Sequence, residues 1–306
     1  MMDVTLLGTG GMMPLPNRYL TSLLTRVDGR MLLIDCGEGT QVTLKQTGFG
    51  YKNLDAICFT HYHADHVTGL PGLLLAVAAT GREEPVTFFG PPGLKRVVES
   101  ICVVARELPF PLRFCELPAS GASELFVENT DYVLHALPLD HACTCFAYTV
   151  EFRRLGRFDV TRAEALGLPK PLWGKLQREE TVEFEGKTYT SDMVLGPTRK
   201  GIKVSYCTDT RPVPGLPAFV SDADLFICEG MYGDPEKADN AARHKHMTYA
   251  EAAQIALAGN VKKLWLTHYS PAMTNPKEFL HVARDIFPNT TAGFDRISET
   301  IMFEED

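Results

Sequence analysis

The sequence of 306 residues contains no apolar run that approaches the roughly 18–20 residues needed to cross a bilayer. Its longest apolar stretch, residues 73–79, has the length of a buried helix. The chain starts with a strand-like segment and has no basic stretch before an apolar core, so no signal peptide is expected. These absences predict a cytoplasmic protein without a membrane anchor.

Disulfide bonds and a basic overall charge are also not expected. The eight cysteines are scattered singly, apart from Cys143 and Cys145, in a chain long enough to bury a core of its own. A reduced compartment therefore fits better than a disulfide framework. The net charge of −8 excludes a uniformly basic surface for nucleic acid, although it permits a local basic patch.

The composition is typical of a globular protein, with 45% hydrophobic and 22% charged residues, and strands alternate with helices to predict an α/β fold. Residues 151–203 differ from the rest. They carry eleven Lys and Arg against eight Asp and Glu, although the whole chain is acidic, and they show no sustained periodicity. The segment is interpreted either as a contact for a polyanion or as a solvated loop insertion.

Several strands and turns can be placed from the pattern. Residues 22–27 and 31–35 flank Asp28-Gly29, which is a strong hairpin signal. Residues 56–60 form a compact apolar strand that runs into a histidine-rich loop. The turn over residues 8–11 either brings backbone close to a site or is purely structural, because the prolines that follow exclude the helix of a dinucleotide-binding turn.

Three helices have recognisable starts. One begins near Asp65 and restarts at Pro71, whose fixed φ suits a first helical turn. Residues 248–251 form a capping box for a helix that ends at Ala258. Asn275 followed by proline predicts a last helix up to about residue 287.

The most specific signal is the run Thr60-His61-Tyr62-His63-Ala64-Asp65-His66 after a predicted strand. His61 and His63 project to one side of an extended segment because one residue separates them. Asp65 and His66 fall where the chain turns into a helix, so their side chains can reach a second ion. Imidazole and carboxylate are the usual zinc ligands where one position stays open for water, so the run predicts a zinc site.

Further ligands stand at the ends of predicted elements. His141 lies between two strands, while Asp209 and His268 each end one. A carboxylate can bridge two cations roughly 3.5–4 Å apart, and such a pair generates a nucleophile from water near neutral pH. Two Zn²⁺ per chain are therefore predicted, with other divalent metals as an alternative and Asp209 as the bridge. The two ligand groups are His61, His63 and His141, and Asp65, His66 and His268.

This ligand set resembles that of the metallo-β-lactamase superfamily, and over nearly the whole chain the sequence is similar to the ribonuclease Z family of tRNA 3′-processing endonucleases. The resemblance implies a four-layer αββα sandwich as a single domain over residues 1–306, with an inserted flexible arm over about residues 151–200. The motifs that carry it are Leu7-Gly8-Thr9-Gly10-Gly11, residues 33–41, Gly156-Arg157-Phe158-Asp159, residues 171–176, 205–211, 246–248 and 266–270.

The family resemblance implies a zinc-dependent endoribonuclease that hydrolyses a phosphodiester to remove the 3′ trailer of precursor tRNA. Asp65 would act as the base. Glu229 and His246 match the pair that, in this family, protonates the departing ribose oxygen, which suits a carboxylate-oriented imidazolium near pH 7. The alternative for this pair is a surface histidine and an unrelated glutamate at a strand end.

The resemblance also implies that the arm grips the tRNA body and that, in a homodimer, it serves the partner's active site. Residues 153–178 hold seven positive side chains against two negative ones. Phosphate neutralisation by this patch would make binding fall steeply with salt. The predicted substrate-binding residues are Arg153, Arg154, Arg157, Lys170, Lys175, Arg178 and Ser270.

Some positions depart from the family pattern but leave the ligand set intact. The family's Gly-Pro pair in the arm reads Lys170-Pro171, Glu229 is flanked by Cys228 and Gly230, and residues 269–273 lack an Arg-Tyr pair. Two other functions stay open. One is a sibling hydrolase of a small phosphodiester, aryl sulfate or other ester, and the other is a metal-stabilised RNA-binding protein without activity.

Overall fold

The computed structural model describes residues 1–127, 132–178 and 180–304. They form two compact units, of which the larger comprises residues 1–151 and 203–302 and the smaller residues 152–202 with 303 and 304. All eight cysteines are free thiols. Within the described ranges, no helix combines the length and the hydropathy of a membrane span.

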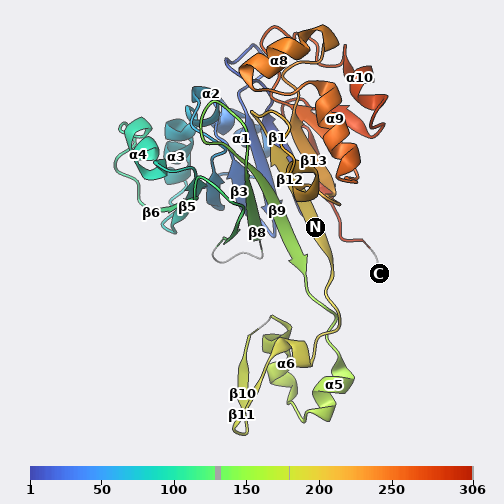
Figure 1. Ribbon diagram of the computed structural model, residues 1–306. Helices are drawn as coiled ribbons and strands as arrows, with labels where there is room; N and C mark the ends of the chain where they lie inside the picture. The colour runs from blue at the N-terminus through green and yellow to red at the C-terminus, as the bar shows by residue number, and fades with distance from the viewer. Residues whose placement is uncertain (128–131, 179, 305–306) are drawn as a thin grey trace. The chain divides into compact units, whose positions relative to one another are not determined.

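The larger unit contains two seven-stranded sheets (Figure 1). In the first sheet the strand order is β16-β1-β2-β3-β4-β5-β6. The predicted hairpin is confirmed, because Asp28 and Gly29 both have positive φ, +50° and +79°, as a two-residue turn with matching twist requires. The strands of this sheet are β1 (Met2–Gly8), β2 (Ser22–Val27), β3 (Arg30–Ile34), β4 (Leu54–Cys58), β5 (Val86–Gly90), β6 (Leu112–Glu116) and β16 (Ser298–Ile301).

The second sheet has the order β15-β14-β13-β12-β9-β8-β7. Strands β12 to β15 pair in parallel, so their carboxyl ends lie at one edge of the sheet. This edge is where polar side chains can gather without interrupting the ladder. The strands are β7 (Ser123–Phe126), β8 (Tyr132–Pro138), β9 (Phe146–Arg154), β12 (Arg199–Cys207), β13 (Leu225–Glu229), β14 (Leu264–Thr267) and β15 (Thr290–Ala292).

Helices cover one face of each sheet. Leu73 of α3 packs in one core cluster with Ile57 and other residues of the first sheet, and Ala252 of α9 packs in another with Phe226 of the second. The helices are α1 (Thr40–Thr47), α2 (Ala64–Val67), α3 (Leu70–Ala78), α4 (Leu94–Ile101), α7 (Leu216–Phe219), α8 (Ala238–His244), α9 (Tyr249–Ala258), α10 (Leu280–Arg284) and the 3-10 turn η2 (Pro235–Lys237).

The two sheets meet through their other faces. The Tyr148 hydroxyl of β9 donates to the Phe59 carbonyl at 2.9 Å, and the Phe146 amide donates to the Thr60 carbonyl at 3.0 Å. Both bonds join the second sheet to the segment that follows β4 in the first. The predicted four-layer αββα architecture is thereby confirmed.

The helix predictions are confirmed except for the last one. The helix near Asp65 restarts with Pro71 in its first turn, and α9 opens with the predicted capping box. The predicted extent of the last helix, from Asn275 to about residue 287, is wrong, because α10 covers only Leu280–Arg284. The Pro276 carbonyl accepts a hydrogen bond from the Tyr249 hydroxyl at 3.0 Å. The Leu280 amide, which would donate to this carbonyl in an α-helix, donates to the Lys277 carbonyl at 3.3 Å. The chain therefore runs in turns before it becomes helical.

The smaller unit has regular structure where the sequence showed no periodicity. The chain enters it from β9 and leaves it through β12. A small core is built around buried Leu176 and Val182, and the Trp173 indole donates to the Leu168 carbonyl at 2.9 Å. Its elements are α5 (Val160–Ala165), α6 (Lys170–Gln177), β10 (Val182–Phe184), β11 (Lys187–Tyr189) and the 3-10 turn η1 (Ser191–Met193).

Candidate metal centre

The predicted ligands all lie at the ends of elements of the larger unit. Asp209 follows the end of β12 by two residues and His268 directly follows β14, and both have positive φ, +49° and +56°. This left-handed backbone turns each side chain off its strand and across the edge of the sheet. The structure thereby brings together the side chains of His61, His63, Asp65, His66, His141, Asp209 and His268.

The first ligand group consists of His61, His63 and His141 with one oxygen of Asp209. The His141 Nε2 and His63 Nδ1 atoms are 3.3 Å apart. Asp209 Oδ2 lies 3.7 Å from both His61 Nε2 and His141 Nε2. These ring nitrogens and the carboxylate oxygen point into one small space, as the ligands of a single cation do.

The second group faces the other oxygen of the same carboxylate. Asp209 Oδ1 lies 3.3 Å from His66 Nε2 and 3.1 Å from His268 Nε2, and these two nitrogens are 3.2 Å apart. Asp65 Oδ2 is 3.4 Å from His268 Nε2. Because each oxygen of Asp209 faces a different group, this carboxylate stands where a bridging ligand of two cations would stand.

Two of the polar atoms at this site lack a hydrogen-bond partner among the described residues, and a metal ion could take that place. His61 Nε2 and Asp209 Oδ1 are buried and have no hydrogen-bond partner. A buried polar atom without a partner costs about 1–3 kcal/mol. A cation would satisfy both atoms, so the composition and the geometry of the donor set agree on a metal-binding role.

A carboxylate outside the ligand set fixes the orientation of His66. The His66 Nδ1–H group donates to Asp35 Oδ2 at 2.8 Å, while Asp35 Oδ1 accepts from the Thr60 amide at 2.8 Å. The bond to Asp35 keeps a proton on Nδ1 and directs Nε2 toward the other ligands, where a metal would replace the proton on Nε2. In the sequence, Asp35 stands only within a family motif and has no predicted role, because nothing in the local pattern places it beside His66.

Backbone groups orient two further ligands. His141 Nδ1 donates to the Lys245 carbonyl at 3.2 Å, which directs Nε2 toward the other ligands. The Met12 amide donates to Asp65 Oδ2 at 2.7 Å. The predicted turn over residues 8–11 thus brings backbone to the site. A side chain at Gly11 would place Cβ 2.7 Å from His268 Cε1, so this close approach requires glycine.

The electrostatics suit metal ligation. Burial lowers the pKa of His61 well below its usual value, so its imidazole is neutral at physiological pH. Burial alone would raise the pKa of Asp65, but a hydrogen bond with His268 and the charge of His66 hold it well below its usual range. Ligands must be neutral imidazole and ionised carboxylate, and both residues meet this requirement.

Glu229 and His246 form a pair, as expected. The His246 Nδ1–H group donates to Glu229 Oε2 at 3.1 Å, and the other oxygen of the buried Glu229 accepts from the Thr210 amide at 2.6 Å. Burial alone would lower the pKa of His246, but the charges of Glu229 and Asp209 outweigh it and raise the pKa to about 9. An imidazolium at neutral pH, a few ångströms from the ligands, can donate a proton.

Arg211 holds the backbone of this histidine. Its guanidinium donates to the His246 carbonyl at 2.5 Å and forms an ion pair with Glu251. Glu251 in turn accepts from the Thr248 amide at 2.8 Å as part of the capping box of α9. Arg211 has no role predicted from the sequence, although it follows Asp209 by two residues.

Two cysteines and the remaining predicted residues lie outside the ligand cluster. Cys143 Sγ is 3.9 Å from His63 Nε2 and Cys145 Sγ is 3.8 Å from His61 Nδ1, which places both thiols beside the ligands. Ser270 follows His268 by two residues. The predicted tRNA-binding residues of the smaller unit are Arg153, Arg154, Arg157, Lys170, Lys175 and Arg178.

Comparison with known proteins identifies the family. A sequence profile described as Anti-Pycsar protein Apyc1 matches residues 2–99, less than half of the chain. Over 306 residues the chain is 51% identical to the ribonuclease Z of Lachnoclostridium phytofermentans and 50% identical to that of Agathobacter rectalis, and each comparison covers both chains completely. The chain belongs to the ribonuclease Z family.

Structural similarity agrees with this assignment. The crystal structure of human tRNase Z, short form (ELAC1), is 25% identical in sequence, with a TM-score of 0.70 over 98% of this chain and 100% of that one. Members of the ribonuclease Z family are metal-dependent hydrolases of the metallo-β-lactamase fold. The predicted fold and the predicted class of enzyme, a metal-dependent endoribonuclease, are both confirmed.

Proposed function

We propose that this ribonuclease Z removes the 3′ trailer of precursor tRNA with two zinc ions. One observation carries the proposal: the two oxygens of Asp209 face two separate ligand groups, beside an imidazole that Glu229 orients. Hydrolysis of a phosphodiester needs a water made nucleophilic and a proton for a poor leaving group. Asp65 is placed to activate the water and His246 to supply the proton. Relatives of this chain at about 50% identity are named Ribonuclease Z.

Two sets of side chains would hold the ions. The first is His61, His63 and His141, the second is Asp65, His66 and His268, and Asp209 is shared. When bound, the ions would polarise the phosphate and lower the pKa of water. Asp65, whose Oδ2 is already fixed by the Met12 amide, would orient the attacking water and accept its proton.

His246 would complete the reaction at the other side of the phosphorus. The bond between phosphorus and the ribose 3′ oxygen breaks, and the departing oxygen takes the proton from the imidazolium of His246. Glu229 keeps the ring in place and stabilises its charged form. Arg211 holds the His246 carbonyl, so both ends of this residue are fixed before substrate binds.

Cleavage of a 3′-extended tRNA by pure protein, with metal analysis, tests the proposal. We expect Asp65→Ala to abolish turnover, since a metal ligand and the base are lost together. His246→Ala should slow cleavage of the natural linkage but have less effect on a diester with a good leaving group. Metal-loaded protein that hydrolyses small esters but leaves the tRNA intact would show a sibling hydrolase, and metal without any turnover would show a binding protein.

The tRNA body would be held by the smaller unit. Its exposed lysines and arginines, among them Lys170 and Lys175 on α6, project from a folded scaffold rather than from a structureless loop. This supports the interpretation of residues 151–200 as an RNA-binding arm within a single-domain chain. Ser270, at the edge of the metal site, would contact the RNA near the scissile bond.

We also propose that the protein is a cytoplasmic homodimer in which each arm serves the partner's site. A mixing experiment tests this arrangement. Asp65→Ala protein with an intact arm is combined with protein that carries Lys170→Gln and Lys175→Gln, after dissociation and reassociation. Restored cleavage indicates that an arm works on the partner's site, whereas activity no higher than the sum of the two variants alone refutes it.

A further inference from the structure

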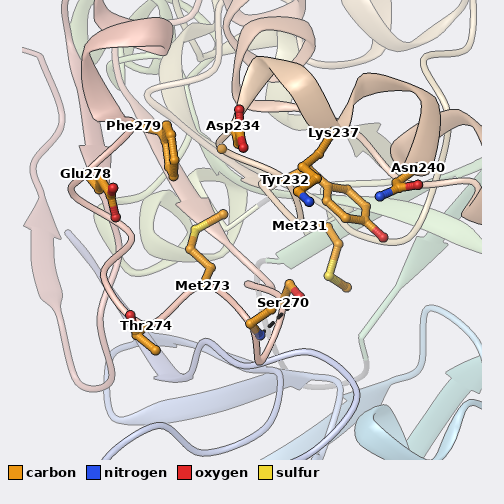
Figure 2. A pocket seen from close by; sticks show the side chains of 12 residues that line it. Met231, Tyr232, Asp234, Lys237, Asn240, Ser270, Met273, Thr274, Glu278 and Phe279 are labelled. Atoms are coloured by element: carbon orange, nitrogen blue, oxygen red, sulfur yellow. Dashed lines mark hydrogen bonds between the residues drawn. The ribbon is translucent and has the colours of Figure 1, made fainter.

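A pocket of about 360 Å³ lies beside the metal centre, and apart from Ser270 the proposed function uses none of its side chains. Its walls come from residues 231–240, which follow β13, and from residues 270–279, which follow β14 (Figure 2). The volume falls in the range of roughly 300–1,000 Å³ that is typical of small-molecule sites. The pocket is therefore large enough for one nucleoside.

The pocket begins at the edge of the reaction centre. Met231 follows Glu229 by two residues, Ser270 follows His268 by two, and the Ser270 amide donates to the Met231 carbonyl at 3.4 Å. A Cβ at Gly11 would lie 2.9 Å from Met231 Cε and 2.7 Å from His268 Cε1, so the side chains of Met231 and His268 both lie against Gly11. The pocket therefore adjoins the candidate metal centre at Met231 and Ser270.

The pocket lies on the side of the leaving group. The ring of Tyr232 is 6.5 Å from the ring of His246, centre to centre, and its hydroxyl hydrogen-bonds with His244 Nδ1 at 3.1 Å. The residue that would protonate the departing 3′ oxygen therefore neighbours a wall of the pocket. A base attached to the ribose that carries this oxygen is within reach of the wall.

The walls suit a flat aromatic ligand. Figure 2 shows Phe279 and Met273 on one side and Tyr232 on the other. Gly233 leaves no space for a side chain, since its Cβ would lie 2.8 Å from Phe279 Cβ, and Met273 Sδ lies 3.2 Å from the Tyr249 hydroxyl oxygen. Aromatic rings and a thioether bind the face of any base, and such stacking tolerates different sequences.

Polar groups at the rim complete a nucleotide site. Asn240, Thr274 and Ser270 offer hydrogen-bond donors and acceptors for the edge of a base or for a ribose. The charged lining residues are Lys237, Asp234 and Glu278 (Figure 2), so the pocket suits an uncharged base better than a phosphate. A mostly apolar cavity with a few polar groups at its edge is the usual design of a small-molecule site.

We propose that this pocket receives the unstacked base of the nucleotide whose 3′ oxygen departs, which is the last nucleotide that the product keeps. The proposal rests on the proposed function, since it takes RNA as the substrate and His246 as the proton donor. The base would sit between Tyr232 and Phe279 with its ribose at the metal centre. Stacking of this base would hold the scissile phosphate in position while the helical part of the RNA stays outside.

Abasic substrates test the location of the base. Three 3′-extended tRNAs are compared: one intact, one without the base of the last retained nucleotide, and one without the base of the first trailer nucleotide. We expect kcat/KM to fall about 5- to 150-fold for the second RNA, the effect of one lost stacked base. The third RNA should be cleaved nearly as well as the first.

Phe279→Leu tests the wall while keeping the position apolar. This variant should lose a similar factor on intact RNA and little more on RNA that lacks the last retained base, because base and ring would act together. Phe219→Leu changes a half-buried phenylalanine elsewhere in the larger unit and should cleave intact RNA like the unaltered protein.

The outcomes separate this inference from the proposed function. If unaltered protein cleaves a small diester but no RNA, the proposed function fails. If it cleaves intact RNA and the second substrate equally well, the pocket does not bind this base. A loss confined to the third RNA would assign the pocket to the trailer and overturn the inference, as would equal losses for Phe279→Leu on intact and abasic RNA.

Discussion

Replacing Asp35 by asparagine should weaken metal binding although Asp35 is not a ligand. The carboxylate accepts the Thr60 amide on Oδ1 and the His66 Nδ1–H on Oδ2, both at 2.8 Å, and the Thr60 hydroxyl also donates to Oδ2 at 2.9 Å. Asparagine has one acceptor oxygen and one NH₂ group. If its oxygen keeps the Thr60 amide, its NH₂ faces Nδ1 of His66, and the imidazole must move its proton to Nε2 or turn away.

The expected size of the effect follows from this geometry. His66 Nε2 is the atom that faces Asp209 and His268, so a proton there blocks the metal. Loss of such a partner behind a ligating histidine typically costs 10- to 100-fold in metal affinity. This corresponds to about 1.4–2.8 kcal/mol. Asparagine also tolerates the positive φ of +62° at this position, so the backbone should be unaffected.

The assay is a titration of metal-free protein with Zn²⁺ in the presence of a competing chelator. Asp55→Asn is the matched control, because Asp55 is also buried but pairs with Arg30 and Arg82 away from the site. We expect the control to lose stability and to keep its metal affinity. Wild-type affinity in Asp35→Asn would refute the argument, as would an equal loss of affinity in both variants.

Three further predictions concern other parts of the molecule. Gly11→Ala should displace His268, with overpacking that costs about 1–3 kcal/mol, and metal analysis should find fewer bound ions per chain. Glu251→Gln should lose about 1–3 kcal/mol of unfolding free energy near pH 7. Burial raises the pKa of Glu251, but hydrogen bonds from Arg211 and the helix cap lower it overall, so urea titrations should show this loss shrinking as pH falls below about 4.3. The double variant Lys170→Gln and Lys175→Gln should bind RNA with a weaker salt dependence. The slope of the logarithm of the binding constant against the logarithm of salt concentration should fall by about one unit for each lost phosphate contact. Lys95→Gln on the larger unit should leave this slope unchanged.

The residues that the structure brings together at the candidate metal centre could be picked out from the sequence because they are tied to local patterns. His61 and His63 share a side of one short segment, and Asp209 and His268 each follow an apolar strand. Parallel strands place their carboxyl ends at one edge, so residues that are far apart in the chain converge without detailed knowledge of the packing.

Groups that act through other residues could not be found in this way. Asp35 and Arg211 reach their partners across the fold, and their contacts depend on tertiary packing that no local period encodes. The same holds for α10, where a hydroxyl from α9 takes the carbonyl that would have continued the helix. In the arm, the helices are short and their core small, so their apolar residues are too few for a periodic signal.

The origin of the ligands has a consequence for folding. His61, His63 and His66 come from the segment after β4 in the first sheet, whereas His141, Asp209 and His268 come from the second. Each cation would thus join both halves of the sandwich, like a removable cross-link. Since the assembled set exists only in the folded chain, binding free energy adds to the free energy of unfolding. Chelation should therefore lower the melting temperature, and the melting temperature of a preparation would report how fully it is loaded with metal.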